Sequence, residues 1–146
     1  MLGSAWAVGE LSVAGIESDS PMAYGFLISD DSGLDVGLYT FPVENSSSPT
    51  LVAKSEDVSA GAMAAGTYYA ATYTSGSPAM PKAWNSVDLA TGTMTKLSDF
   101  SEGSPLYVDM TYDYARNKLL GIYHYNANST SVAEINPADG SVTATY

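Results

Sequence analysis

Apolar and polar side chains alternate in the last third of the chain. Between residues 106 and 113 every second residue is apolar, which is the period of a β-strand with two different faces. Three further strand-like segments follow at residues 118–125, 131–136 and 142–145, each separated from the last by a short polar turn. This stretch predicts a four-stranded antiparallel meander.

The turn before the last strand has a counterpart earlier in the chain. Residues 87–95 and 135–143 share one pattern: aliphatic, Asp or Asn, any residue, Ala, Thr or Asp, Gly, any residue, apolar, Thr. A weaker third copy aligns Phe41 with Val87 and Ile135, at spacings of 46 (41 to 87) and 48 (87 to 135) residues. Strands are also expected at residues 23–29, 50–53, 67–74 and 93–97. The period predicts about three meanders of four strands each, with almost no helix.

The sequence indicates the opening strand more clearly in some units than in others. Residues 59–66 (SAGAMAAG) can supply it in the second unit, because small residues suit a strand crowded by its neighbours. A helix is the alternative, which Gly61, Gly66 and the short length disfavour. In the first unit the opening strand is expected within residues 6–13 or is absent.

The repeated turn, at residues 87–95 and 135–143, resembles a signature of secreted bacterial β-propellers of the quinoprotein-like and lactonase-like kind. The resemblance extends from about Met22 to the end and implies one all-β domain with blades at about 5–57, 58–102 and 103–146. Three blades do not close a ring, which takes at least four. The chain is therefore expected to be an incomplete β-propeller and part of a longer one, unless copies assemble or the sheets form an open sandwich.

The alternation also predicts which side chains form the core. Because a blade buries both faces, the third unit is expected to leave an uncovered face at Leu119, Tyr123 and Tyr125, through which the chain self-associates or is covered by further blades. The predicted core comprises Phe26, Ile28, Leu38, Phe41, Tyr69, Trp84, Val87, Val108, Met110, Leu120, Ile122, Val132 and Ile135.

Charge and composition exclude several classes of function. The 146 residues include 16 acidic and 5 basic side chains, giving a net charge of −11 that disfavours nucleic acid and anionic membranes as partners. The absence of cysteine excludes disulfides, zinc–thiolate sites and cysteine nucleophiles. No run reaches transmembrane length. Residues 5–7 (AWA) fit either the tail of a cleaved signal or a short strand.

The only histidine, His124, is a candidate for chemistry. A hairpin turn at residues 114–117 would place His124 opposite Tyr107, with Asp109 on the same face. This arrangement suggests either an acid–base pair or, as we favour, a histidine packed against tyrosine. Together with Tyr123, these residues form the candidate ligand-binding set.

The many tyrosines of the second and third units suit a recognition surface for protein or carbohydrate, and they equally suit packing inside a β-fold.

The densest acidic turn contains Asp30, Asp31 and Asp35, with a glycine at position 33. Calcium favours carboxylates on a glycine-bearing loop, but the spacing lacks the EF-hand order. The segment is therefore either a weak metal site or a solvated hairpin turn, and we favour the turn.

These features favour a non-enzymatic binding or scaffold module of an extracellular, cell-surface or periplasmic bacterial protein, with no cofactor. One alternative is part of a propeller enzyme, such as a lactonase-like hydrolase or a quinoprotein, with its catalytic ligands on other blades. Another is a structural repeat whose edge strands pair between copies.

Overall fold

The computed structural model describes residues 21–28, 33–76, 78–126 and 129–146, and these residues form strands and turns without any helix. They accordingly contain no helix long and apolar enough to cross a bilayer. The prediction of an all-β fold is confirmed. The strands are β1 (Met22–Leu27), β2 (Gly37–Pro42), β3 (Thr50–Lys54), β4 (Val58–Ala64), β5 (Thr67–Thr74), β6 (Met80–Asp88), β7 (Thr93–Asp99), β8 (Leu106–Asp113), β9 (Lys118–Asn126), β10 (Ser129–Ile135) and β11 (Val142–Thr145).

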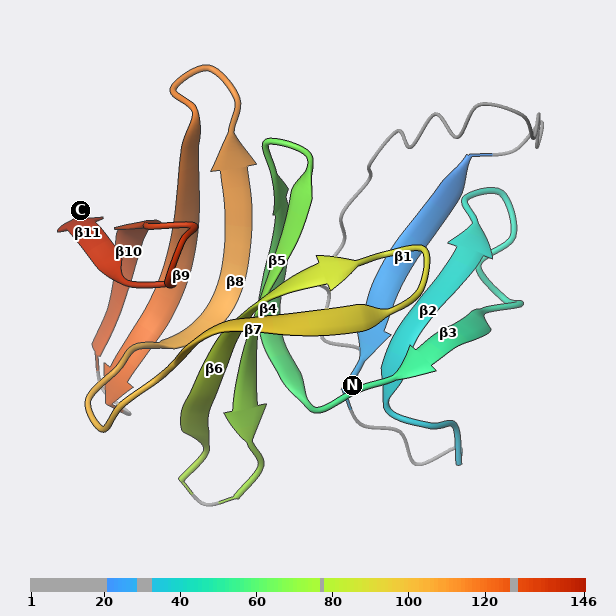
Figure 1. The fold of residues 1–146 in the computed structure, drawn as a ribbon, viewed down its shortest axis with the longest axis horizontal. Coiled ribbons are helices and arrows are strands. Elements are labelled where there is room, and N and C mark those ends of the chain that lie inside the picture. The colour runs from blue at the N-terminus through green and yellow to red at the C-terminus, as the bar shows by residue number, and fades with distance from the viewer. Residues whose placement is uncertain (1–20, 29–32, 77, 127–128) are drawn as a thin grey trace.

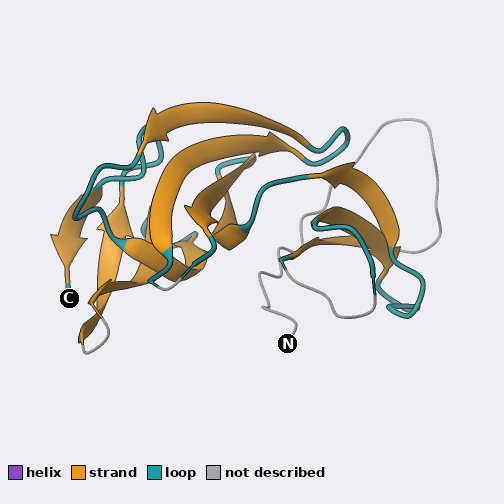
Figure 2. Ribbon diagram, turned by 90° about the horizontal axis from the view of Figure 1, so that it is seen from below, coloured by secondary structure: helices purple, strands orange, loops and turns teal. Residues whose placement is uncertain are grey.

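The strands form three antiparallel sheets, each a meander in chain order. The first sheet holds β1 to β3, the second β4 to β7 and the third β8 to β11. The opening strand expected for the first unit lies outside the described residues. Residues 59–66, for which a helix was the alternative, belong largely to β4. The sheets follow one another along the longest axis of the molecule, with the first and third at opposite ends (Figures 1 and 2).

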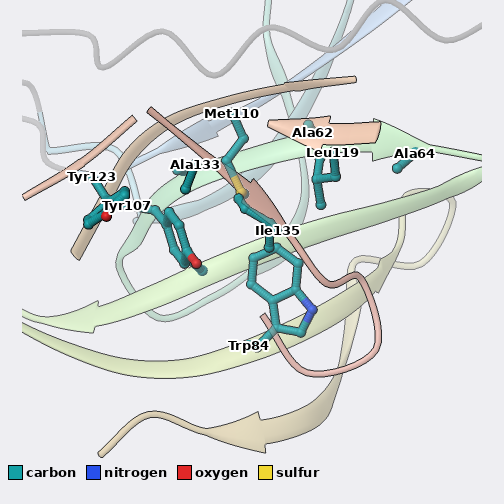
Figure 3. Packing of buried hydrophobic residues seen from close by; sticks show 11 residues of the cluster. Ala62, Ala64, Trp84, Tyr107, Met110, Leu119, Tyr123, Ala133 and Ile135 are labelled. Carbon is teal, nitrogen blue, oxygen red and sulfur yellow. The ribbon is translucent and has the colours of Figure 1, made fainter. Parts of the chain in front are cut away.

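One hydrophobic core joins the second sheet to the third, and Figure 3 shows its side chains. Its centre is Trp84, whose side chain is fully buried and stacks on Tyr69 with ring centroids 5.7 Å apart. Three alanines at alternate positions of β4 face the third sheet and leave room for β8 to lie alongside β4. They are Ala60, Ala62 and Ala64.

A second core joins the first sheet to the second. Phe26 and Leu38 from the first sheet meet Tyr68 and Val87 from the second. Gly61 is required here, because a Cβ at that position would run into the ring of Tyr68. The middle sheet therefore buries both faces, as a sheet between two others must.

The repeated turns fasten each sheet to the one before it. In both turns the glycine amide donates to the carbonyl four residues earlier, Gly92 to Asp88 at 2.7 Å and Gly140 to Asn136 at 2.8 Å. Both glycines have positive φ, 72° and 74°. Gly92 lies against Ala53 of the first sheet, so close that there is no space for a Cβ on the glycine. We call these two turns the latch turns.

The second latch turn covers Trp84. The indole Nε1 of Trp84 donates to the carbonyl of Pro137 at 2.9 Å, and a Cβ on Gly140 would lie 2.7 Å from two ring atoms of Trp84. The Tyr107 hydroxyl donates to the carbonyl of Gly140 at 2.7 Å. The repeat found in the sequence is therefore a repeat of contacts between sheets as well as of strands.

The core prediction is confirmed for six of its thirteen residues and wrong for three residues of the third sheet. Val108, Ile122 and Val132 are 41%, 38% and 40% exposed. Of the other predicted core residues, six are buried (Phe26, Leu38, Trp84, Val87, Met110 and Ile135) and four are half-buried (Ile28, Phe41, Tyr69 and Leu120).

The uncovered face of the third sheet was also misassigned. Leu119 and Tyr123 are buried against the second sheet, with exposures of 1% and 0%, and the side chain of Tyr125 lies outside the described residues. The uncovered face is the opposite one, which carries Ile122 and Val132. Neighbouring residues of β9 are apolar on both faces, so alternation alone could not choose between them.

Candidate functional site

The four candidate ligand-binding residues divide between the two faces of the third sheet. Tyr107 and Tyr123 form a directly opposed pair, and both are fully buried on the inner face. His124 pairs with Leu106, and Asp109 pairs with Ile122. Because His124 and Ile122 are two residues apart in β9, His124 and Asp109 share the outer face.

The predicted pairing of His124 with Tyr107 is wrong by one residue. The register of β8 and β9 follows the hairpin prediction from Asp113 to Asp109 and then shifts at a bulge. Val108 is the extra residue, so Val108 and Asp109 together oppose Ile122. A bulge of this kind leaves no clear mark in a sequence that keeps alternating.

The polar groups on the outer face have local partners. The His124 Nδ1 lies 3.0 Å from the Thr130 hydroxyl, and an Asp109 carboxylate oxygen accepts from the Met110 amide at 2.8 Å. No group of three His, Cys, Asp or Glu side chains within the described ranges is placed to hold a metal ion.

The acidic turn is described only in part. Asp30 and Asp31 lie outside the described residues. The Asp35 carboxylate forms an exposed ion pair of 2.8 Å with Lys54. The weak metal site therefore stays a prediction.

The tyrosines serve mainly as packing. Tyr68, Tyr107 and Tyr123 are buried, and burial raises the pKa of Tyr68 far above its usual range. Tyr114 and Tyr146 are the exceptions at 71% and 72% exposed, and the ring of Tyr114 meets Tyr112 edge-on with centroids 4.9 Å apart.

The most distinctive surface is the outer face of the third sheet. At its centre, Ile122 of β9 pairs directly with Val132 of β10, and the bulged Val108 lies on the other side of Ile122. Leu120 is half-buried beside them. We call the surface formed by Val108, Leu120, Ile122, His124 and Val132 the open face.

A charged group borders the open face. The Lys118 ammonium lies 2.5 Å from a Glu134 carboxylate oxygen, which also accepts from the Tyr146 hydroxyl at 3.2 Å. The hydrogen bond to Lys118 lowers the pKa of Glu134, and the same bond raises the pKa of Lys118. The two charges compensate each other at the edge of an apolar centre.

The repeat alignment shows what is unusual about the open face. Leu38, Trp84 and Val132 occupy the same position in the three units, at the spacings of 46 (38 to 84) and 48 (84 to 132) that align the turns. Leu38 is 1% exposed and Trp84 0%, because the next sheet covers each of them, whereas Val132 is 40% exposed.

The residues that pair with these three show the same difference in exposure: they are buried in the first two units and exposed in the third. Phe26 and Ala71 are 6% and 1% exposed, and Ile122 is 38% exposed. The alignment was present in the sequence and could have identified the open face.

Comparison with models of protein families, with curated protein sequences and with solved structures gives no match. The resemblance of the latch turns to propeller signatures thus remains a prediction, and function has to be argued from the surface itself.

Proposed function

We propose that the chain is a non-enzymatic binding or scaffold module that holds a protein partner against its open face. The observation that carries this proposal is the exposure of Ile122 and Val132 at positions where the preceding sheets are covered, with the exposed Val108 beside them. Grouped apolar side chains on a sheet are typical of surfaces that are covered in the working state.

The architecture we propose is an incomplete β-propeller. Three features support it: consecutive meanders, β4 lying alongside β8, and latch turns that repeat the same hydrogen bond between residues 88 and 92 and between residues 136 and 140. In a propeller, successive blades pack face to face around an axis in the same way. The resemblance noted for the turns supports an extracellular, cell-surface or periplasmic bacterial setting.

The candidate ligand residues are divided between the two faces of the third sheet, which argues against a shared catalytic site and leaves His124 and Asp109 on the outer face. Tyr107 and Tyr123 are enclosed in the core, so they serve the packing of the sheets. A hydrolase assay tests the alternative: wild type should release no more product from lactone and ester substrates than buffer does. Hydrolysis that is lost in both His124→Ala and Asp109→Asn would contradict the proposal.

Photo-crosslinking tests the proposed surface in the native host. A photoreactive residue at Val132, 40% exposed, should crosslink to protein, whereas the same residue at Leu97, 41% exposed on β7, should not. Equal crosslinking at the two positions, or none at Val132, would refute the scaffold function. Crosslinks within one longer polypeptide would indicate that further blades cover the open face.

A further inference from the structure

We propose that the partner of the open face is a second copy of this chain, so that two copies pack face to face across a two-fold axis. Each copy would cover Val108, Ile122 and Val132 of the other. This inference rests on the scaffold function proposed above and names its partner.

The first step concerns the kind of partner surface that could cover the open face. In the first two units the positions of Ile122 and Val132 are covered by a β-sheet, namely the next sheet of the chain. Aligned packing of two sheets, with their apolar side chains interleaved, suits a flat face whose centre is aliphatic. A second β-sheet is therefore the occupant that the repeat itself predicts.

The second step is which face a second copy can offer. Both faces of the second sheet and the inner face of the third are already buried. In the first sheet, the face turned away from the second carries Ala23 and Tyr39, which are only 5% and 7% exposed. The open face is thus the exposed apolar sheet face that the described residues provide, and a face that pairs with itself gives a closed dimer.

No other described surface groups large exposed apolar side chains in this way. Of the others, Tyr146 lies at the border of the open face through its hydrogen bond to Glu134, and the rest each lie in a different strand or turn: Leu34, Val43, Met80, Leu97 and Tyr114.

The third step is charge. Residues 103–146, which form the third sheet, hold four acidic and two basic side chains and therefore carry only −2 of the net −11. Two copies that pair through the third sheet therefore bring together units of small net charge, and the repulsion between them is screened over about 8 Å in physiological salt.

The edge of the face is also compatible with burial. Glu134 would be costly to enclose alone, but its carboxylate is already paired with Lys118 and hydrogen-bonded to Tyr146. The dimer would therefore have an aliphatic centre and a compensated polar edge, as stable interfaces do.

Sedimentation equilibrium of the purified full chain tests the dimer. The expected mass is twice 15.2 kDa at micromolar concentration. Ile122→Asp and Val132→Asp should each raise the dimer dissociation constant at least about thirtyfold, as the loss of a central contact does. Leu97→Asp, a matched exposed apolar residue outside the face, should leave the constant unchanged. A wild-type monomer at several hundred micromolar, or a dimer that resists both aspartates, would overturn the proposal.

A thiol experiment does not depend on a disruptive variant. The chain has no cysteine, so Val132→Cys carries a single thiol. A short bis-maleimide should link two Val132→Cys chains at dilution, while Leu97→Cys should remain unlinked. Equal yields for the two variants would refute pairing through the open face. Crosslinks in the host from Val132 to a different protein, with a purified monomer, would sustain the scaffold function and reject the second copy as its partner.

Discussion

The latch turn over Trp84 makes the sharpest prediction. Gly140 has a φ of 74°, which costs an L-residue about 1–2 kcal/mol. A Cβ at Gly140 would also lie 2.7 Å from Cγ and Cδ2 of Trp84, and overfilling a packed site costs about 1–3 kcal/mol. Gly140→Ala should therefore lower the free energy of unfolding by roughly 2–5 kcal/mol, the sum of these two effects.

Gly103→Ala is the matched control. Gly103 has a φ of 85° in a turn, and a Cβ there would meet no heavy atom within 4 Å. This variant should show the conformational cost alone, about 1–2 kcal/mol, and the entropy that alanine removes from the unfolded chain is the same in both variants. The difference between the two variants isolates the contact with Trp84.

Urea unfolding followed by far-UV circular dichroism measures both variants under one protocol. If the second latch turn stabilises the packing of the sheets, Gly140→Ala should be less stable than Gly103→Ala by about 1–3 kcal/mol. This difference corresponds to a shift in melting temperature of roughly 2–12 °C. If the two variants are equally stable, the contact between the second latch turn and Trp84 does not hold the sheets together.

Three further predictions concern single sites. Ala65 has a φ of 48° beside Gly66 in the hairpin between β4 and β5, so Ala65→Asn should raise the melting temperature by relieving a strain of about 0.5–1 kcal/mol, and no gain would contradict the turn geometry. Hydrogen bonds from Ser141 lower the pKa of Asp139, so the stability they confer is present above the unfolded pKa of about 3.9 and is lost as pH falls through the lower native value. The free energy of unfolding of Asp139→Asn, measured in urea, should therefore differ from that of wild type at pH 6 and equal it in strong acid. A difference that persists in strong acid would point to another cause. Ile135→Ala, at a site 2% exposed, should cost about 2–5 kcal/mol in the same assay, whereas a change within about 0.5 kcal/mol would show that the side chain is not in the core.

Alternation and turn chemistry predicted most of the strands. The segments predicted at residues 67–74, 106–113 and 142–145 match β5, β8 and β11, because each strand is bounded by turn residues that fix its ends. The turn at Gly140 was found from its sequence alone, and the positive φ of Gly140 and its closeness to the ring of Trp84 account for the glycine.

The choice of face in the third sheet was not predictable from alternation. β9 carries Leu119 and Leu120, and then Ile122 and Tyr123, so that apolar side chains point to both sides. Which side is buried depends on the neighbouring sheet, whose alanines in β4 make space for Tyr107 and Leu119. The bulge at Val108 then shifts the pairing of His124, which displaced the predicted site by one residue.

The latch turns give the molecule a direction. Each one closes backwards, from the second sheet onto Ala53 and from the third onto Trp84, so a sheet is completed by its successor. Because the chain is synthesised from its N-terminus, the residues of each sheet emerge before the turn that contacts them. The open face of the third sheet corresponds in the repeat to the face of the second sheet that the second latch turn covers.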